Sequence, residues 1–157
     1  MKFAACAMIA ASSILIGAAV SSYLSRRVEV LDAALRLISM IETRMSCFLE
    51  PLDELLYAVR ARSPLMRGAA ETDFYSAWSG VFSGADLPLC ERDRELLLSF
   101  GASLGNTDLA GQRALCRETS ERLRASLDDA REDKKRFSRL GAALPVFAGA
   151  AVIIMFV

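Results

Sequence analysis

The sequence predicts an all-α fold, a bundle of about five to six helices flanked by N- and C-terminal transmembrane helices. Two observations predict it. Between its ends the chain shows no sustained alternation of apolar and polar residues, and leucine, alanine, arginine and glutamate dominate, which favours helices over strands. Apolar residues make up 54% of the chain and are concentrated in its first and last segments.

The two terminal segments, residues 3–24 and 140–157, contain no charged residue. About 20 apolar residues are enough for a helix to cross the hydrocarbon core of a bilayer, and each segment is close to that length. We therefore divide the chain into a transmembrane anchor at 1–25, a helical domain at 26–139 and a second anchor at 140–157. The membrane lipid bilayer is the first expected partner.

The first segment has an alternative interpretation as a cleaved signal peptide, since it begins with Lys2 and is rich in alanine and serine. Its apolar run is longer than a usual signal core, and Arg26 and Arg27 follow directly. A retained anchor is therefore favoured. With cleavage, the product would be an exported, tail-anchored helical adaptor protein.

Basic residues predict the direction of insertion. Arg26, Arg27 and Arg36 follow the first segment, and five basic residues at 131–139 precede the second. Because lysine and arginine collect on the cytoplasmic side, the central domain is expected in the cytoplasm, with both ends spanning the membrane. The four cysteines show no C-x-x-C spacing, which fits a reducing compartment and small, buried thiols.

Helical periodicity locates the first elements of the central domain. Apolar residues recur every three or four positions from Leu31 until Pro51 interrupts the pattern, and a second helix is expected from there to about Arg62. A further helix, capped by Asp73, is expected to place five large side chains in the core. These are Phe74, Tyr75, Trp78, Val81 and Phe82. An exposed aromatic binding patch is the alternative for them.

The stretch around Gly105 predicts a tight antiparallel helix hairpin. Gly105 is well placed to end one helix in the left-handed conformation. Asn106 or Thr107 is expected to cap the next helix, with the Asp108 carboxylate on its positive first turn. Gly101 lies inside its helix at a cost of about 1 kcal/mol relative to alanine, which indicates close contact with a neighbouring helix.

The last helix is expected to run from Asp108 without a breaker until Pro145. A narrow apolar seam repeats along it every seven residues. The seam residues are Cys116, Leu123, Ala130 and Phe137. Pairs of opposite charge, such as Glu118 with Arg122, are typical of a solvated face. We expect this helix to leave the bundle and continue into the second anchor.

Composition argues against several classes of function. The chain has no histidine, phosphate-binding loop, nucleophile elbow, metal cluster or dinucleotide-binding motif, so neither an enzyme nor a cofactor is expected. The formal net charge is zero, which gives no reason to expect nucleic acid as a partner. No small-molecule substrate is expected either.

Two blocks of residues resemble the stage III sporulation protein AB family. The more specific block comprises Phe100, Gly101, Leu104, Gly105, Asp108 and Gln112, then Lys135, Arg139, Leu140 and Gly141 ahead of the hydrophobic tail. Upstream, Glu42, Pro51 and Leu52 match a pattern of an acidic helix followed by Pro-Leu. Arg44 stands where an acidic residue is usual in the family. The matching residues are our candidates for structural or partner-contact positions.

The resemblance implies a structural membrane component of the channel between mother cell and forespore that endospore formation requires. It implies a soluble domain similar to the cytoplasmic domain of the type II secretion F platform protein. The partners it implies are a stage III sporulation ATPase and other membrane subunits of the channel, and the location is the mother-cell (outer forespore) membrane. A homo-oligomer is also compatible with the sequence.

Overall fold

Two long helices and three short ones make up the part of the chain that the structure describes. The computed structural model describes the backbone of residues 2–48, 52–67 and 73–156, and the side chains of residues 15–46, 54–67 and 73–139. The helices are α1 (Lys2–Phe48), α2 (Leu52–Arg62), α3 (Phe74–Ser83), α4 (Glu91–Ser103) and α5 (Leu109–Phe156). No strand occurs in these backbone ranges, which confirms the predicted all-α class.

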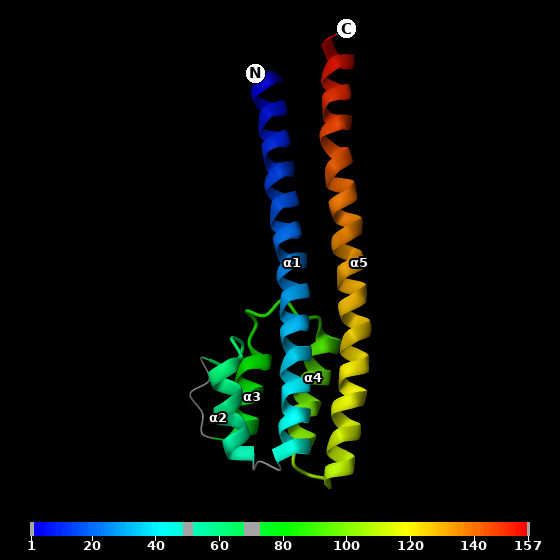
Figure 1. Cartoon of the computed structure of the whole chain (residues 1–157). Helices are drawn as coiled ribbons and strands as arrows, with labels where there is room; N and C mark the ends of the chain where they lie inside the picture. The colour runs from blue at the N-terminus through cyan, green and yellow to red at the C-terminus, as the bar shows by residue number, and fades with distance from the viewer. Residues whose placement is uncertain (1, 49–51, 68–72, 157) are drawn as a thin grey trace.

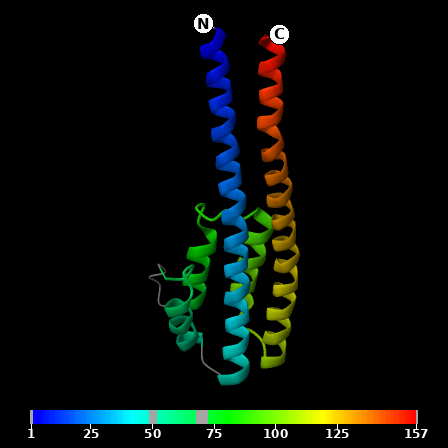
Figure 2. The same ribbon diagram turned by 45° about the horizontal axis from the view of Figure 1, so that its top comes forward.

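The long helices α1 and α5 lie side by side, and the three short helices pack around one half of this pair (Figure 1). Both ends of the chain lie on the same side, beyond the short helices, and the tilted view in Figure 2 shows the same arrangement. Helix α4 contacts both α3 and α5, while α2 contacts α1 and α3. The bundle therefore occupies one end of a long two-helix stem.

The boundary between anchor and bundle is not a boundary between helices. We expected the first bundle helix to begin after the anchor, but α1 runs unbroken from Lys2 to Phe48. Neither proline nor glycine occurs between residues 18 and 48 to interrupt it. Five helices account for the described backbone, which agrees with the predicted five to six. The continuity of α5 from the bundle into the second terminal segment is as expected, whereas the continuity of α1 is not.

Membrane spanning is not established by the described residues. Within them, no helix has a stretch that is both long enough and apolar enough to cross a bilayer. The described side chains do not include those of residues 1–14 and 140–157. These two ranges contain most of the first predicted anchor and all of the second. The two anchors stay predictions.

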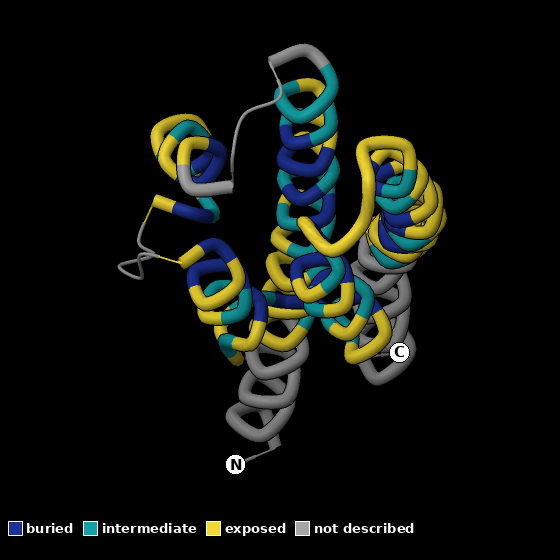
Figure 3. Tube along the Cα trace, turned by 90° about the horizontal axis from the view of Figure 1, so that it is seen from below, coloured by how far each residue is buried: buried dark blue, intermediate teal, exposed yellow. Residues whose placement is uncertain are grey.

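One core is formed by a single face of each helix, as the view from below shows (Figure 3). On α1 the predicted stripe is confirmed at Leu31, Ile38 and Ile41, which are fully buried. On α5, seam residues Cys116, Leu123 and Ala130 are buried, while Phe137 is only partly buried. The seam thus ends where α5 leaves the bundle.

The aromatic helix α3 faces the core. Asp73 caps it as predicted, accepting a hydrogen bond from the Ser76 backbone N–H at 3.0 Å. The side chains of Phe74, Trp78 and Phe82 are at most 3% exposed, and only Tyr75 is substantially exposed. An exposed aromatic patch is therefore the wrong interpretation for these three buried rings.

Candidate functional site

The turn between α4 and α5 brings together most of the motif residues. Helix α4 ends at Ser103 and α5 begins at Leu109. Gly105 lies between them with φ 89°, the left-handed conformation predicted for it. Leu104 is buried and donates its backbone N–H to the Phe100 carbonyl at 3.0 Å. The turn lies at the end of the bundle farthest from the termini (Figure 1).

Asp108, rather than Asn106 or Thr107, caps α5. Its Oδ1 accepts a hydrogen bond from the Gly111 backbone N–H at 3.0 Å. Asn106 instead donates from Nδ2 to the Ala102 carbonyl at 2.8 Å, and Thr107 Oγ1 accepts from Gln112 Nε2 at 3.1 Å. Both predicted caps are thus engaged in closing the turn, which leaves Asp108 as the residue that satisfies the helix start.

The buried side chain of Gln112 is hydrogen-bonded to the same turn. Its side chain is 3% exposed, and Nε2 donates to both the hydroxyl and the carbonyl oxygen of Thr107. A buried amide N–H must find acceptors, and Nε2 finds them on the loop that precedes its own helix, while the buried Oε1 has no hydrogen-bond partner among the described residues. This contact joins the first turns of α5 to the chain leaving α4.

Replacing Gly105 by valine is expected to destabilise the protein by about 1–2 kcal/mol, because a β-branched side chain is strained at positive φ. Thermal unfolding of the full chain in detergent micelles, followed by circular dichroism, measures the change. Ala102→Val is the control: it adds the same side chain at an exposed helical position and is expected to cost less than about 0.7 kcal/mol. Equal melting curves for the two variants would contradict a strained turn.

Gly101 is a point of very close approach between α3 and α4. A Cβ added to it would lie 2.3 Å from Cδ1 of the Trp78 side chain, which is shorter than any real contact. The indole Nε1 of Trp78 donates to the Leu97 carbonyl at 2.6 Å, on the same stretch of α4. Gly101 is therefore required so that the indole ring can lie directly on the backbone of α4. The predicted close contact with a neighbouring helix is confirmed.

Glu42 and Cys116 connect α1 to the start of α5. Burial, and secondarily the negative charge of Glu42, raise the pKa of the Cys116 thiol from 9.0 to about 11. The thiol therefore stays protonated at neutral pH and packs as a small apolar side chain. In the described side chains, Cys116 is buried and Cys90 is partly buried, and both are free thiols.

The second half of the motif lies elsewhere. Gln112 and Arg139 are about 40 Å apart along α5, at about 1.5 Å per residue. Arg139 and Lys135 are exposed and line an open hollow of about 410 Å³ on α5. Leu140 and Gly141 continue the helix, but their surroundings lie outside the described side chains, as does the side chain of Leu52 at the start of α2. Pro51 lies outside the described residues altogether. The motif thus divides into a turn and a distant basic stretch.

An ion-pair cluster that we did not predict joins three helices where α1 and α5 leave the bundle. Arg27 of α1 lies 3.3 Å from Asp93 of α4 and 3.9 Å from Asp133 of α5. Asp93 is 1% exposed. A signal was present in the sequence, because Asp93 lies four residues before Leu97 and is therefore on the apolar face of its helix. We had counted Arg27 only as a membrane-flanking charge.

The motif residues around the α4–α5 turn pack the bundle and fix the direction of the chain. Within the side chains of residues 15–46, 54–67 and 73–139, no three or more His, Cys, Asp or Glu residues are placed to hold a metal ion. This end of the bundle presents the exposed residues 105–110 outward, from the loop and the first residues of α5.

Comparison with known proteins identifies the family. A family model described as stage III sporulation protein AB matches residues 2–157. Searches of curated proteins and of solved structures give no match. The family match spans all five helices and supports a role in stage III of sporulation. The chain belongs to the stage III sporulation protein AB family.

Proposed function

We propose that the chain is a structural, non-enzymatic platform subunit of the channel complex between mother cell and forespore. Its helical bundle would lie in the mother-cell cytoplasm and bind the stage III sporulation ATPase. Its two terminal segments would anchor it in the mother-cell (outer forespore) membrane beside other subunits of the complex. Family membership supports the sporulation role, and the arrangement of the two long helices supports the platform.

The arrangement of α1 and α5 carries the proposal. Both helices leave the bundle on the same side and continue, without a linker, into the two segments that lack charged residues (Figure 1). A flexible linker would let the bundle drift relative to the membrane, whereas two continuous helices keep it at a constant height. A constant height suits a base on which a motor protein docks.

Ion pairs between the two long helices support the same role. Arg27 of α1 lies 3.9 Å from Asp133 of α5, and Asp32 of α1 lies 3.9 Å from Arg131 of α5. In one pair the arginine is on α1 and the aspartate on α5, and in the other pair the positions are exchanged. Both pairs form at the same alignment of the two helices and therefore favour it. Exposed pairs of this kind contribute little stability each, but they select one alignment of the two helices as they leave the bundle.

Co-purification tests the platform directly. The full chain, solubilised in detergent micelles, is expected to retain the stage III sporulation ATPase. A reporter fused at residue 80 is expected to be active only in the cytoplasm. Absence of binding, together with normal spore numbers after deletion of the gene, would overturn the proposal.

Intact mass distinguishes the exported adaptor from the platform. A platform anchored at both ends keeps its first segment, so the protein purified from sporulating cells is expected at its full mass of 17.1 kDa. Removal of a signal peptide would shorten it by about 15–30 residues. A shortened chain would favour the exported adaptor.

A further inference from the structure

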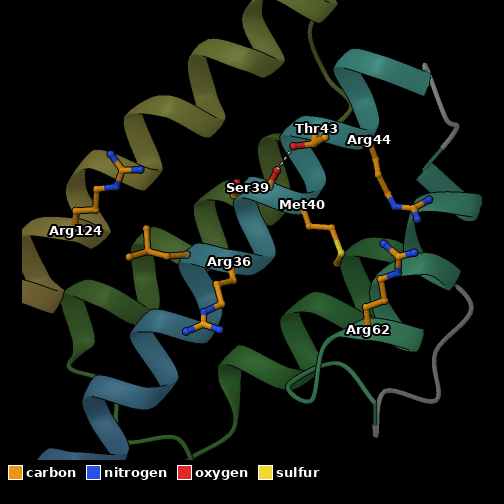
Figure 4. A pocket seen from close by; sticks show the side chains of 8 residues that line it. Arg36, Ser39, Met40, Thr43, Arg44, Arg62 and Arg124 are labelled. Carbon is orange, nitrogen blue, oxygen red and sulfur yellow. Dashed lines mark hydrogen bonds between the residues drawn. The ribbon is translucent and has the colours of Figure 1, made fainter.

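An open groove between α1, α2 and α5 is lined by four arginines and no carboxylate. It has a volume of about 640 Å³, and the arginines are Arg36, Arg44, Arg62 and Arg124. They come from three helices, and Figure 4 shows the side chains of Arg44 and Arg62 pointing toward one another from α1 and α2. Arg36 pairs with Asp32 at 2.6 Å, but the four arginines outnumber this one carboxylate. In a chain whose formal net charge is zero, the groove therefore carries a local excess of positive charge, which attracts anionic groups.

The groove has an apolar floor. Leu35 and Met40 line it and are partly buried against the core. Ser39 and Thr43 lie beside them, with the Thr43 hydroxyl donating to the Ser39 carbonyl at 2.8 Å. An apolar floor with a basic rim suits a ligand that carries both apolar and acidic groups.

The groove is elongated along α1. A neighbouring hollow of about 390 Å³ shares Arg36, Met40 and Arg62 with it and extends to Glu29. From Glu29 to Arg44, the two hollows follow α1 for about 22 Å, at about 1.5 Å per residue. A surface of this length fits about four turns of a helix, which binds a groove through one face.

The position of the groove along α1 favours a protein partner over a membrane lipid. With the first predicted anchor ending at residue 25, Arg36 lies about 17 Å and Arg44 about 29 Å farther along the helix. The headgroup layer of a bilayer adds only about 5–8 Å to each side of its hydrocarbon core. Lipid headgroups would therefore not reach the four arginines.

We propose that this groove docks an acidic, amphipathic helix of a cytosolic protein partner. The inference rests on the proposed function, because it assigns the surface through which the platform holds its ATPase. The partner helix places apolar side chains on Leu35 and Met40 and carboxylates beside the arginines. Its acidic end lies toward Arg44, since Glu29 and Asp32 line the opposite end.

Charge reversal tests the groove with a matched control. Arg62→Glu/Arg124→Glu changes two exposed arginines of the rim, and Arg67→Glu/Arg122→Glu changes two exposed arginines that do not line it. Arg122 lies on the opposite side of α5 from Arg124 and makes an exposed pair with Glu118. Both variants change the net charge equally. Melting curves of each in detergent micelles verify that the fold is retained.

Binding of the full-length protein in micelles to the purified ATPase is then measured for each variant. We expect the groove variant to bind at least about tenfold more weakly and the control within about threefold of the wild type. The wild-type affinity should also fall as the salt concentration rises. In sporulating cells, the groove variant is expected to lower the count of heat-resistant spores, and the control to leave it unchanged.

Three results would contradict docking at the groove without contradicting the proposed platform function. They are binding by the groove variant at the wild-type level, equal weakening of both variants, and saturable binding of ATP or inorganic phosphate to the chain alone that the groove variant loses. The last would identify a small-anion site. Failure of the wild-type chain itself to bind the ATPase would instead overturn the proposed function, and the groove with it.

Discussion

Trp78→Ala is expected to destabilise the bundle by about 3–5 kcal/mol, the range for removing a large aromatic side chain from a core. Trp78 is fully buried, with its ring centroid 5.6 Å from that of Phe74, 4.7 Å from Phe82 and 5.3 Å from Phe100. Its Nε1 also donates to the Leu97 carbonyl at 2.6 Å. The substitution removes the centre of an aromatic cluster that holds α3 on α4.

A double-mutant cycle with Gly101 makes this prediction specific. Gly101→Ala in the wild-type background is expected to cost about 1–3 kcal/mol, because the new methyl group would overlap the indole ring. In the Trp78→Ala background the overlap is absent, and alanine is favoured over glycine inside a helix by about 1 kcal/mol. Gly101→Ala should therefore change sign and become stabilising.

Thermal and urea unfolding of the full chain in detergent micelles, followed by circular dichroism, give the four stabilities. A coupling energy of several kcal/mol between the two positions is expected, which is large for a pair of side chains. If Gly101→Ala cost the same in both backgrounds, the contact between the indole ring and the α4 backbone would be refuted.

Asp93→Ala is expected to destabilise the protein by about 3–5 kcal/mol, since it leaves Arg27 without its most deeply buried partner. The carboxylate of Asp93 is 1% exposed and the Arg27 side chain 17% exposed, at a separation of 3.3 Å. Among its described ion-pair partners Arg27 then keeps only Asp133, which is 54% exposed and 3.9 Å away, so a largely buried charge loses its closest partner without regaining water.

Two further variants separate loss of the pair from loss of charge. Asp133→Ala removes the outer partner of Arg27, which is 54% exposed, and is expected to cost less than about 1 kcal/mol. Arg27→Met/Asp93→Leu replaces both buried charges by apolar groups and is expected to recover most of the stability lost in Asp93→Ala. Wild-type melting behaviour of Asp93→Ala would show that the pair contributes nothing.

Much of the fold could be predicted because it depends on local patterns. The spacing of apolar residues on α1 and the seven-residue repeat on α5 located the buried faces, since a helix turns every 3.6 residues whatever it packs against. Gly105 and Asp73 were predicted correctly for the same reason, because a left-handed turn and an N-cap involve only neighbouring residues.

The errors arose where several local choices were allowed. Asn106, Thr107 and Asp108 are all good helix caps, so propensity could not choose between them. The choice was made by Gln112, whose buried amide takes the Thr107 oxygens, and by Asn106, which bonds back to α4. The predicted division at residue 25 does not coincide with a helix end, because α1 runs unbroken from Lys2 to Phe48.

The sequence by itself determined the helical class, the faces that are buried, the Gly105 turn and the family to which the chain belongs. The tertiary structure alone decided that Trp78 lies on Gly101, that Arg27 meets Asp93, and that arginines from α1, α2 and α5 line one groove. The physical reason is range: periodicity, capping and turn geometry act within a few residues, whereas these contacts join residues far apart in the chain. They exist only once the helices have packed.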